Sequence, residues 1–126
     1  MTERAIVDRA PGNTKHVLAA HDGNGATHMR LFDTIESAPF QFLEWDFPPG
    51  TTEGAHHHRD DQVGLEHYLV TEGDLVIVID GEEHHLAAGD AVAIPREAVR
   101  ETRNQSDYAA RAALVFERLR QEGADD

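Results

Sequence analysis

The residues of this chain best suited to chemistry are histidines and carboxylates gathered near its middle. His56, His57 and His58 follow a Pro-Gly turn, and Glu66 stands at the head of the next expected strand. Residues two apart on a strand point the same way, so His56 and His58 should project together while His57 faces the other side. Two imidazoles and one carboxylate suit Fe(II), Mn(II), Ni(II) or Zn(II). The pattern predicts one divalent metal ion held by His56, His58 and Glu66, against the alternatives of a solvated histidine cluster on a loop and a strand-edge carboxylate.

Short strands separated by tight turns must position these side chains. Leu43, Trp45 and Phe47 alternate with acidic residues, as expected for a half-buried strand. Further short strands are expected at 66–71, 74–80, 83–86, 91–94 and 99–103. Gly73, Gly81 and Gly89 lie between them, where tight turns need a positive φ. No βαβ alternation is visible, so the pattern predicts an antiparallel all-β sandwich or barrel.

The two ends of the chain are less regular than its middle. Residues 1–24 are expected to form an N-terminal arm with one short strand near 16–20, residues 25–117 the barrel, and residues 118–126 a charged tail. The segment 108–119 is open between two interpretations. Its apolar residues fall at helical spacing and it is rich in alanine, but 113–117 also alternates as a closing strand.

The histidine region resembles the first motif of the cupin family, G-x5-H-x-H-x3/4-E-x6-G. Gly50, His56, His58, Glu66 and Gly73 match it in order, with seven residues between His58 and Glu66 where the family has three or four. An enlarged hairpin loop at 59–64 explains the longer gap. The resemblance covers about residues 40–117 and implies an antiparallel double-stranded β-helix, the jelly-roll barrel of the RmlC-like cupin superfamily.

The second cupin motif, G-x5-P-x-G-x2-H-x3-N, is degenerate in this chain. Gly89, Pro95 and Asn104 match, whereas Glu97 replaces a glycine and Arg100 replaces the histidine that is the family's fourth metal ligand. A guanidinium offers no lone pair to a metal. The site then has three ligands plus water, or a substitute ligand, or no metal at all. The candidates for a substitute ligand are Gln62, Asp60, Asp61, His67 and His84.

Arg100 and Glu97 are the residues predicted to act on a substrate. An arginine at the barrel mouth can clamp a carboxylate or phosphate, so Arg100 is expected to anchor an anionic small molecule, with a surface salt bridge as the alternative. Glu97 lies in the same loop and is a guess for the general base.

Composition narrows the class of protein. With 126 residues, 11 Lys plus Arg against 24 Asp plus Glu, and a net charge of −13, the chain is expected to be one domain that avoids nucleic acid and anionic membranes. It has no cysteine, which excludes disulfides and fits a reducing compartment. Neither a signal peptide nor a membrane span is visible, so a cytoplasmic location is expected. The resemblance also implies a homodimer.

Two functions remain open at this point. The first is a metal-dependent cupin enzyme acting on a small organic molecule by oxygenase, isomerase, cyclase or lyase chemistry at a 2-His-1-carboxylate site. The second is a non-catalytic small-molecule-binding cupin module, which a missing fourth ligand would favour. Fold alone does not decide between them.

Overall fold

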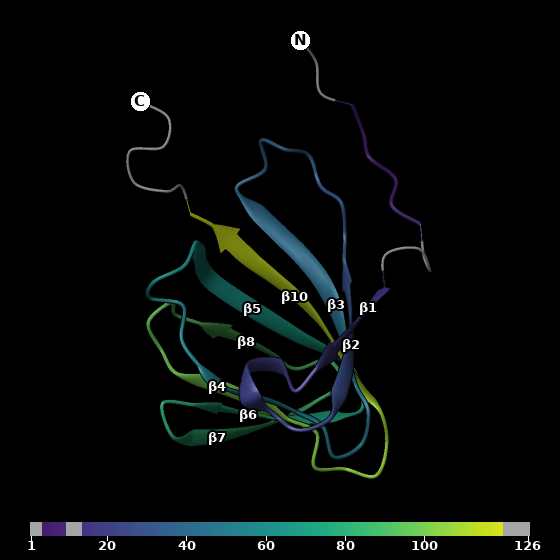
Figure 1. Cartoon of the computed structure of the whole chain (residues 1–126), viewed down its shortest axis with the longest axis vertical. Helices are drawn as coiled ribbons and strands as arrows, with labels where there is room; N and C mark the ends of the chain where they lie inside the picture. Colours follow the sequence, from purple (N-terminus) through teal and green to yellow (C-terminus); the bar gives the residue numbers. More distant parts are fainter. Residues whose placement is uncertain (1–3, 10–13, 120–126) are drawn as a thin grey trace.

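The strands are arranged in two antiparallel sheets with the core between them (Figure 1). The structure is a computed structural model that describes residues 4–9 and 14–119. The six-stranded sheet has the order β1 (Thr14–Leu18), β2 (Ala26–Leu31), β3 (Phe40–Phe47), β10 (Ala110–Arg118), β5 (Val63–Glu72) and β8 (Ala91–Ile94). The four-stranded sheet has the order β4 (Thr52–His56), β9 (Arg100–Arg103), β6 (Asp74–Ile79) and β7 (Glu82–Ala87). This confirms the all-β jelly-roll barrel.

Glycine turns join neighbouring strands where the sequence places them. Gly73, Gly81 and Gly89 all have a positive φ, as predicted. Asp80 precedes Gly81 with a φ of 49°, so both central residues of the β6–β7 hairpin are left-handed, which matches the twist of the strands. This turn fixes the register of the β6–β7 pair, whereas the turns at Gly73 and Gly89 connect strands of different sheets.

Alternation along the strands separates an interior face from an outer one. Trp45 and Phe47 on β3 pack in the core with Tyr68 on β5 and with Ile77 on β6. Phe40, on the same strand β3, is exposed. The interior also holds buried polar and charged side chains: Thr27, Thr51, Glu53, His58, Glu66, Arg100, Thr102 and Asn104. Buried polar groups need partners, so this polar interior is where a site should be sought.

The C-terminal segment left open by the sequence is a strand. β10 lies between β3 and β5, with Leu114 opposite both Leu43 and Tyr68. Its helical propensity is overridden because β10 pairs with a strand on each side, forming two ladders of backbone hydrogen bonds inside the six-stranded sheet.

The structure describes only part of the N-terminal arm and the C-terminal tail that the sequence predicts. β1 provides the short strand expected near 16–20, and a 3-10 turn, η1 (Ala20–Asp22), follows it. Parts of the predicted arm and tail, at 1–3, 10–13 and 120–126, lie outside the described residues. Among the described residues, 4–9 and 14–119, no helix is long and apolar enough to cross a membrane.

Candidate metal centre

Two side chains of strand β4, Glu53 and His56, both point into the barrel. Simple alternation along the strand would place them on opposite faces. Glu53 pairs with Thr102 and His56 with Arg100, so two residues of β4 lie opposite one of β9, and the ladder shifts register between them. Such a bulge re-aims the side chains beyond it. Glu53 and His56 therefore both face inward.

Glu53 is a buried carboxylate held by two hydroxyl groups. Its side chain is 3% exposed. The Tyr68 hydroxyl donates to its Oε1 at 3.2 Å, and the Thr102 hydroxyl donates to the same atom at 3.5 Å. Burial, together with the negative charge of Glu66, raises the pKa of Glu53 to about 8. Its Oε2 is left facing the histidines.

His56 presents one defined ring nitrogen to that carboxylate. Its Nδ1 donates to the Gly54 carbonyl at 2.8 Å, so the lone pair of the neutral ring lies on Nε2. Burial lowers the pKa of His56 to about 4, which keeps the ring neutral near pH 7. Nε2 is 3.6 Å from Glu53 Oε2. This is how metal-binding histidines are commonly oriented, with the second nitrogen on a backbone carbonyl.

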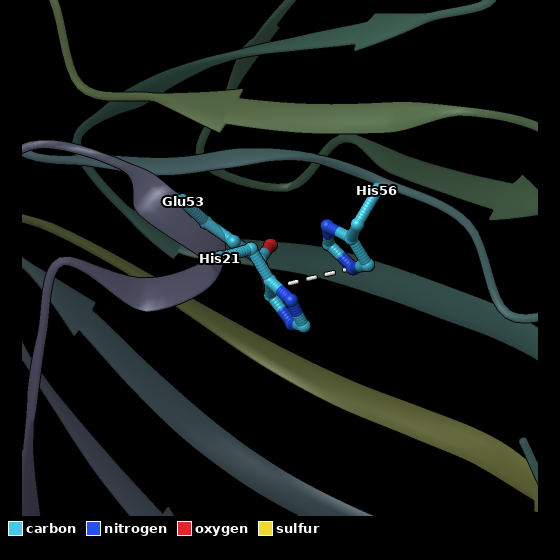
Figure 2. A group of neighbouring side chains, drawn as sticks. All are labelled: His21, Glu53 and His56. Atoms are coloured by element: carbon cyan, nitrogen blue, oxygen red, sulfur yellow. Dashed lines mark ion pairs between the residues drawn. The ribbon is translucent and has the colours of Figure 1, made fainter.

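His21 reaches the same oxygen from outside the motif region. It lies on η1, and its Nε2 is also 3.6 Å from Glu53 Oε2. Burial lowers its pKa as well. One ligand atom from each of His21, Glu53 and His56 lies within 4.8 Å of the others, and Figure 2 shows the three side chains converging. The sequence analysis missed His21 and Glu53. Only the Gly23-Asn24-Gly25 turn after His21 hinted that this segment is folded.

Glu66 is paired with a cation of the protein itself. Arg100 Nη1 donates to Glu66 Oε1 at 2.8 Å, and the arginine side chain is 0% exposed. Its other nitrogens donate to the carbonyls of Ala98, Pro95 and Arg96. Burial raises the pKa of Glu66, and the Arg100 charge opposes that shift. Direct contact between Arg100 and a substrate would require this pair to open.

His58 is oriented by an acidic residue of its own loop. Its Nδ1 donates to Asp61 Oδ2 at 2.6 Å, and its ring meets that of His56 edge to face at 4.9 Å. Burial raises the pKa of Asp61, but its hydrogen bonds with His58 and the Val63 N–H lower it overall. Arg96 holds the loop by donating to the carbonyls of residues 58, 59 and 61. The enlarged loop at 59–64 is thus held in place by these hydrogen bonds.

The remaining predicted residues lie away from this centre. Glu97, Gln62, Asp60 and His67 are exposed. His84 is partly exposed and lies 3.4 Å from Glu82. The roles predicted for Arg100 and Glu97, and the ligand set His56, His58 and Glu66, stay predictions.

His56 belongs to two possible ligand sets, and their donor atoms differ. In the family's set, Glu66 is already paired with the Arg100 guanidinium. In the other set, His21, Glu53 and His56 supply two imidazole nitrogens and a carboxylate oxygen. That donor set is typical of zinc and of divalent iron, manganese or nickel.

Comparisons with known proteins agree with this architecture. The profile of the family described as "Cupin domain" matches residues 43–116, more than half of the chain. The chain is 33% identical over 76 residues to the HTH-type transcriptional regulator PuuR of Escherichia coli (strain K12), covering 59% of this chain and 32% of that protein. The chain thus spans about a third of the length of the curated relatives it matches.

Solved structures show the same fold. A predicted oxalate decarboxylase from Thermotoga maritima superposes with a TM-score of 0.76 at 20% identity, covering 85% of this chain and 93% of that one. Oxalate oxidase in complex with the substrate analogue glycolate superposes with a TM-score of 0.63 at 22% identity, covering 73% of this chain and 51% of that one. At these identities the likeness is one of fold.

Proposed function

This chain belongs to the cupin domain family, and from that premise we propose that it is a metal-dependent enzyme acting on a small, anionic organic molecule. One observation carries the proposal. The neutral His56 imidazole, fixed by the Gly54 carbonyl, aims Nε2 at a buried carboxylate inside the barrel. Burial raises the pKa of Glu53 to about 8, so the group is largely protonated near pH 7, and a divalent cation would take the place of that proton.

The chain's own residues would prepare this site in three ways. Gly54 fixes the tautomer of His56, while Tyr68 and Thr102 bind one oxygen of Glu53 and leave the other free. The surrounding apolar core, which includes Trp45 and Phe47, would limit the access of water. When bound, the metal would polarise a carbonyl or carboxylate oxygen as a Lewis acid, or provide open positions for O2.

A small carboxylic acid is the proposed substrate class. The similar folds include a predicted oxalate decarboxylase and an oxalate oxidase bound to glycolate. The chain itself carries a net charge of −13, so attraction for an acid would have to come from local cations. The bound metal would be such a cation, because Arg100 is already paired with Glu66.

The second candidate function is a non-catalytic module that binds a small molecule. It is favoured by the match to part of a transcriptional regulator and by the loss of the second-motif histidine at Arg100. Incubation of the metal-loaded protein with oxalate or glycolate separates the two. An enzyme consumes an acid, which NMR of the mixture detects, whereas a module binds it unchanged.

Homodimerisation is proposed as a further property of the chain. Phe42 on β3 lies opposite Val115 on β10, and both are exposed on the outer face of the six-stranded sheet. Leu65 and Leu69 on β5 extend the same apolar face. Exposed apolar patches commonly mark interfaces, and a second copy would cover this one. Light scattering should give a dimer that Phe42→Glu converts to a monomer. A monomeric wild-type chain would overturn this proposal.

Metal analysis of the purified, untagged chain tests the main proposal. We expect about one equivalent of iron, manganese, nickel or zinc per chain, and loss of it in His56→Ala. His56 belongs to both possible ligand sets, so this result does not depend on which one is correct. No metal in the wild-type chain, even after reconstitution with each ion, would overturn the proposal.

A further inference from the structure

We infer that the metal ion is bound by His21, Glu53 and His56, and not at the ligand positions of the family motif. This inference rests on the metal dependence proposed above. The ligand class is a first-row divalent cation, with zinc as its simplest probe. The family position would instead use Glu66 and His58.

The two possible metal positions, at Glu53 and at Glu66, differ in the charges that surround the carboxylate. Glu66 already has a cation, because the fully buried Arg100 donates to it at 2.8 Å. A metal ion bound to Glu66 would face this guanidinium at short range, and like charges repel strongly in a buried site. The ion-pair partners of Glu53 are His21 and His56, which add no charge when neutral. Glu53 is therefore the carboxylate whose direct partners carry no charge, and a bound metal ion would take the place of its proton.

Two imidazole nitrogens lie beside the same carboxylate oxygen of Glu53. Nε2 of His21 and Nε2 of His56 are each 3.6 Å from the same Oε2 atom. Ligand atoms about 2 Å from a shared tetrahedral metal lie roughly 3.3 Å apart, so these two nitrogen–oxygen distances are close to those of a metal site. Tyr68 and Thr102 bind only the other oxygen, as partners of a ligating carboxylate commonly do.

His21 lies in a strained loop that is hydrogen-bonded to β4. Ala19, His21 and Asp22 all have φ between 49° and 62°, a left-handed conformation that non-glycine residues rarely adopt. Asn24 ties the loop to β4, because its N–H donates to the Thr52 hydroxyl and its carbonyl accepts from the Thr52 N–H. Strained residues this close together persist where the surrounding structure enforces them, often at ligand sites.

Two glycines allow the loop to approach β4 this closely. A Cβ at Gly54 would lie 1.9 Å from the His21 carbonyl oxygen, and one at Gly23 would lie 2.2 Å from that of Thr52. Any side chain at either position would push η1 off β4. The close contact therefore serves to hold His21 beside Glu53.

Metal binding requires one ring to turn. The His21 and His56 rings are stacked, with centroids 3.7 Å apart and planes 10° from parallel. Imidazole lone pairs lie in the ring plane, so two parallel rings cannot both aim at one ion. His56 is fixed by Gly54, whereas the His21 side chain is 46% exposed. His21 is thus the ring that rotates.

Calorimetric titration of the chelator-stripped full chain with zinc chloride tests the inference. His21→Ala and Glu53→Gln should each weaken zinc binding by more than the roughly 10–100-fold typical of losing an outer-shell partner. Glu66→Gln is the variant that separates the two positions, because it should still bind zinc if the ion lies at Glu53. His67→Ala is the histidine control and should bind zinc as the wild-type chain does. His21 is on an exposed loop, so its variant is expected to fold.

The outcomes distinguish this inference from the proposed function. Zinc binding that survives in His21→Ala and Glu53→Gln but is lost in His58→Ala would place the ion at the family position, overturning the inference alone. A wild-type chain that binds no zinc, iron, manganese or nickel would overturn both. Should Glu66→Gln fail to fold, full affinity in His21→Ala would by itself still overturn the inference.

Discussion

The two carboxylates inside the barrel, Glu53 and Glu66, have the same chemistry and opposite surroundings. Both are buried, and burial raises the pKa of each. Glu66 is matched by the Arg100 guanidinium, whereas Glu53 is matched by two hydroxyl groups and two histidines. The barrel thus supplies its own cation to one carboxylate, and the proposed metal ion would be the cation for the other. Under this proposal, the loss of a family ligand at Arg100 is not the loss of the metal site.

The largest expected effect comes from breaking the internal ion pair. Glu66→Gln leaves the Arg100 charge buried without a counter-ion, and such a change typically costs roughly 3–5 kcal/mol. Urea unfolding should show this loss of unfolding free energy. In metal-free protein, Glu53→Gln should cost little, because the amide oxygen still accepts from Tyr68. An equal loss of unfolding free energy in Glu66→Gln and Glu53→Gln would contradict the difference proposed between the two carboxylates.

The glycine contact beneath His21 should have the next largest effect. Gly54→Ala places a methyl group against the His21 carbonyl and forces η1 away from β4. Comparable overpacking costs about 1–3 kcal/mol, and zinc affinity should fall with it. Urea unfolding and zinc titration of the same sample measure both. Wild-type zinc affinity in this variant would show that the loop is not needed to position His21.

The pH dependence of stability should report Glu53 in the metal-free chain. A carboxyl pKa raised from 4.5 to about 8 stabilises the fold below pH 4.5, and this contribution is lost as pH rises through 8. The His56 pKa, lowered from 6.5 to about 4, acts in the opposite direction but only below pH 6.5. Unfolding free energy should therefore fall by about 2 kcal/mol between pH 6.5 and 8.

Comparison with Glu53→Gln isolates this effect. The variant should show a much flatter profile over the same range, and saturating zinc should flatten the wild-type profile as well. A wild-type chain whose stability is constant or rises from pH 6.5 to 8 would contradict the assignment of an uncompensated carboxylate.

The smallest expected effect concerns the hydroxyl that holds Glu53. Tyr68→Phe removes the donor to Oε1 at 3.2 Å and should cost about 1 kcal/mol of stability. It should also move the pH midpoint of Glu53 upward, because the charged form loses a hydrogen bond. Urea unfolding across pH measures both, and an unchanged midpoint would mean that Tyr68 does not stabilise the carboxylate.

Much of the fold follows from local signals in the sequence. Alternating apolar residues and glycine turns predict β3 and the hairpins, because side-chain period and left-handed turns are local properties. β10 could not be assigned in the same way. Its alanines favour a helix, and only pairing with β3 and β5 decides for a strand.

The proposed metal centre could be predicted only in part from the sequence. His56 was predicted from strand parity and from the motif, and its role as a ligand stays a prediction. Glu53 was missed because the bulge before His56 breaks the parity that would otherwise turn it outward. His21 was missed because it reaches the barrel through a long-range loop contact with no sequence period. Arg100 was recognised as a departure, but its pairing with Glu66 became visible only in three dimensions.

A zinc-loaded crystal, measured at the zinc absorption edge, tests the central claim most directly. The account predicts one anomalous peak about 2.0–2.2 Å from His21 Nε2, His56 Nε2 and Glu53 Oε2, with the His21 ring rotated out of its stack. The Glu66–Arg100 pair should be intact in the same map. A peak bound to Glu66 and His58, with Arg100 displaced, would contradict it.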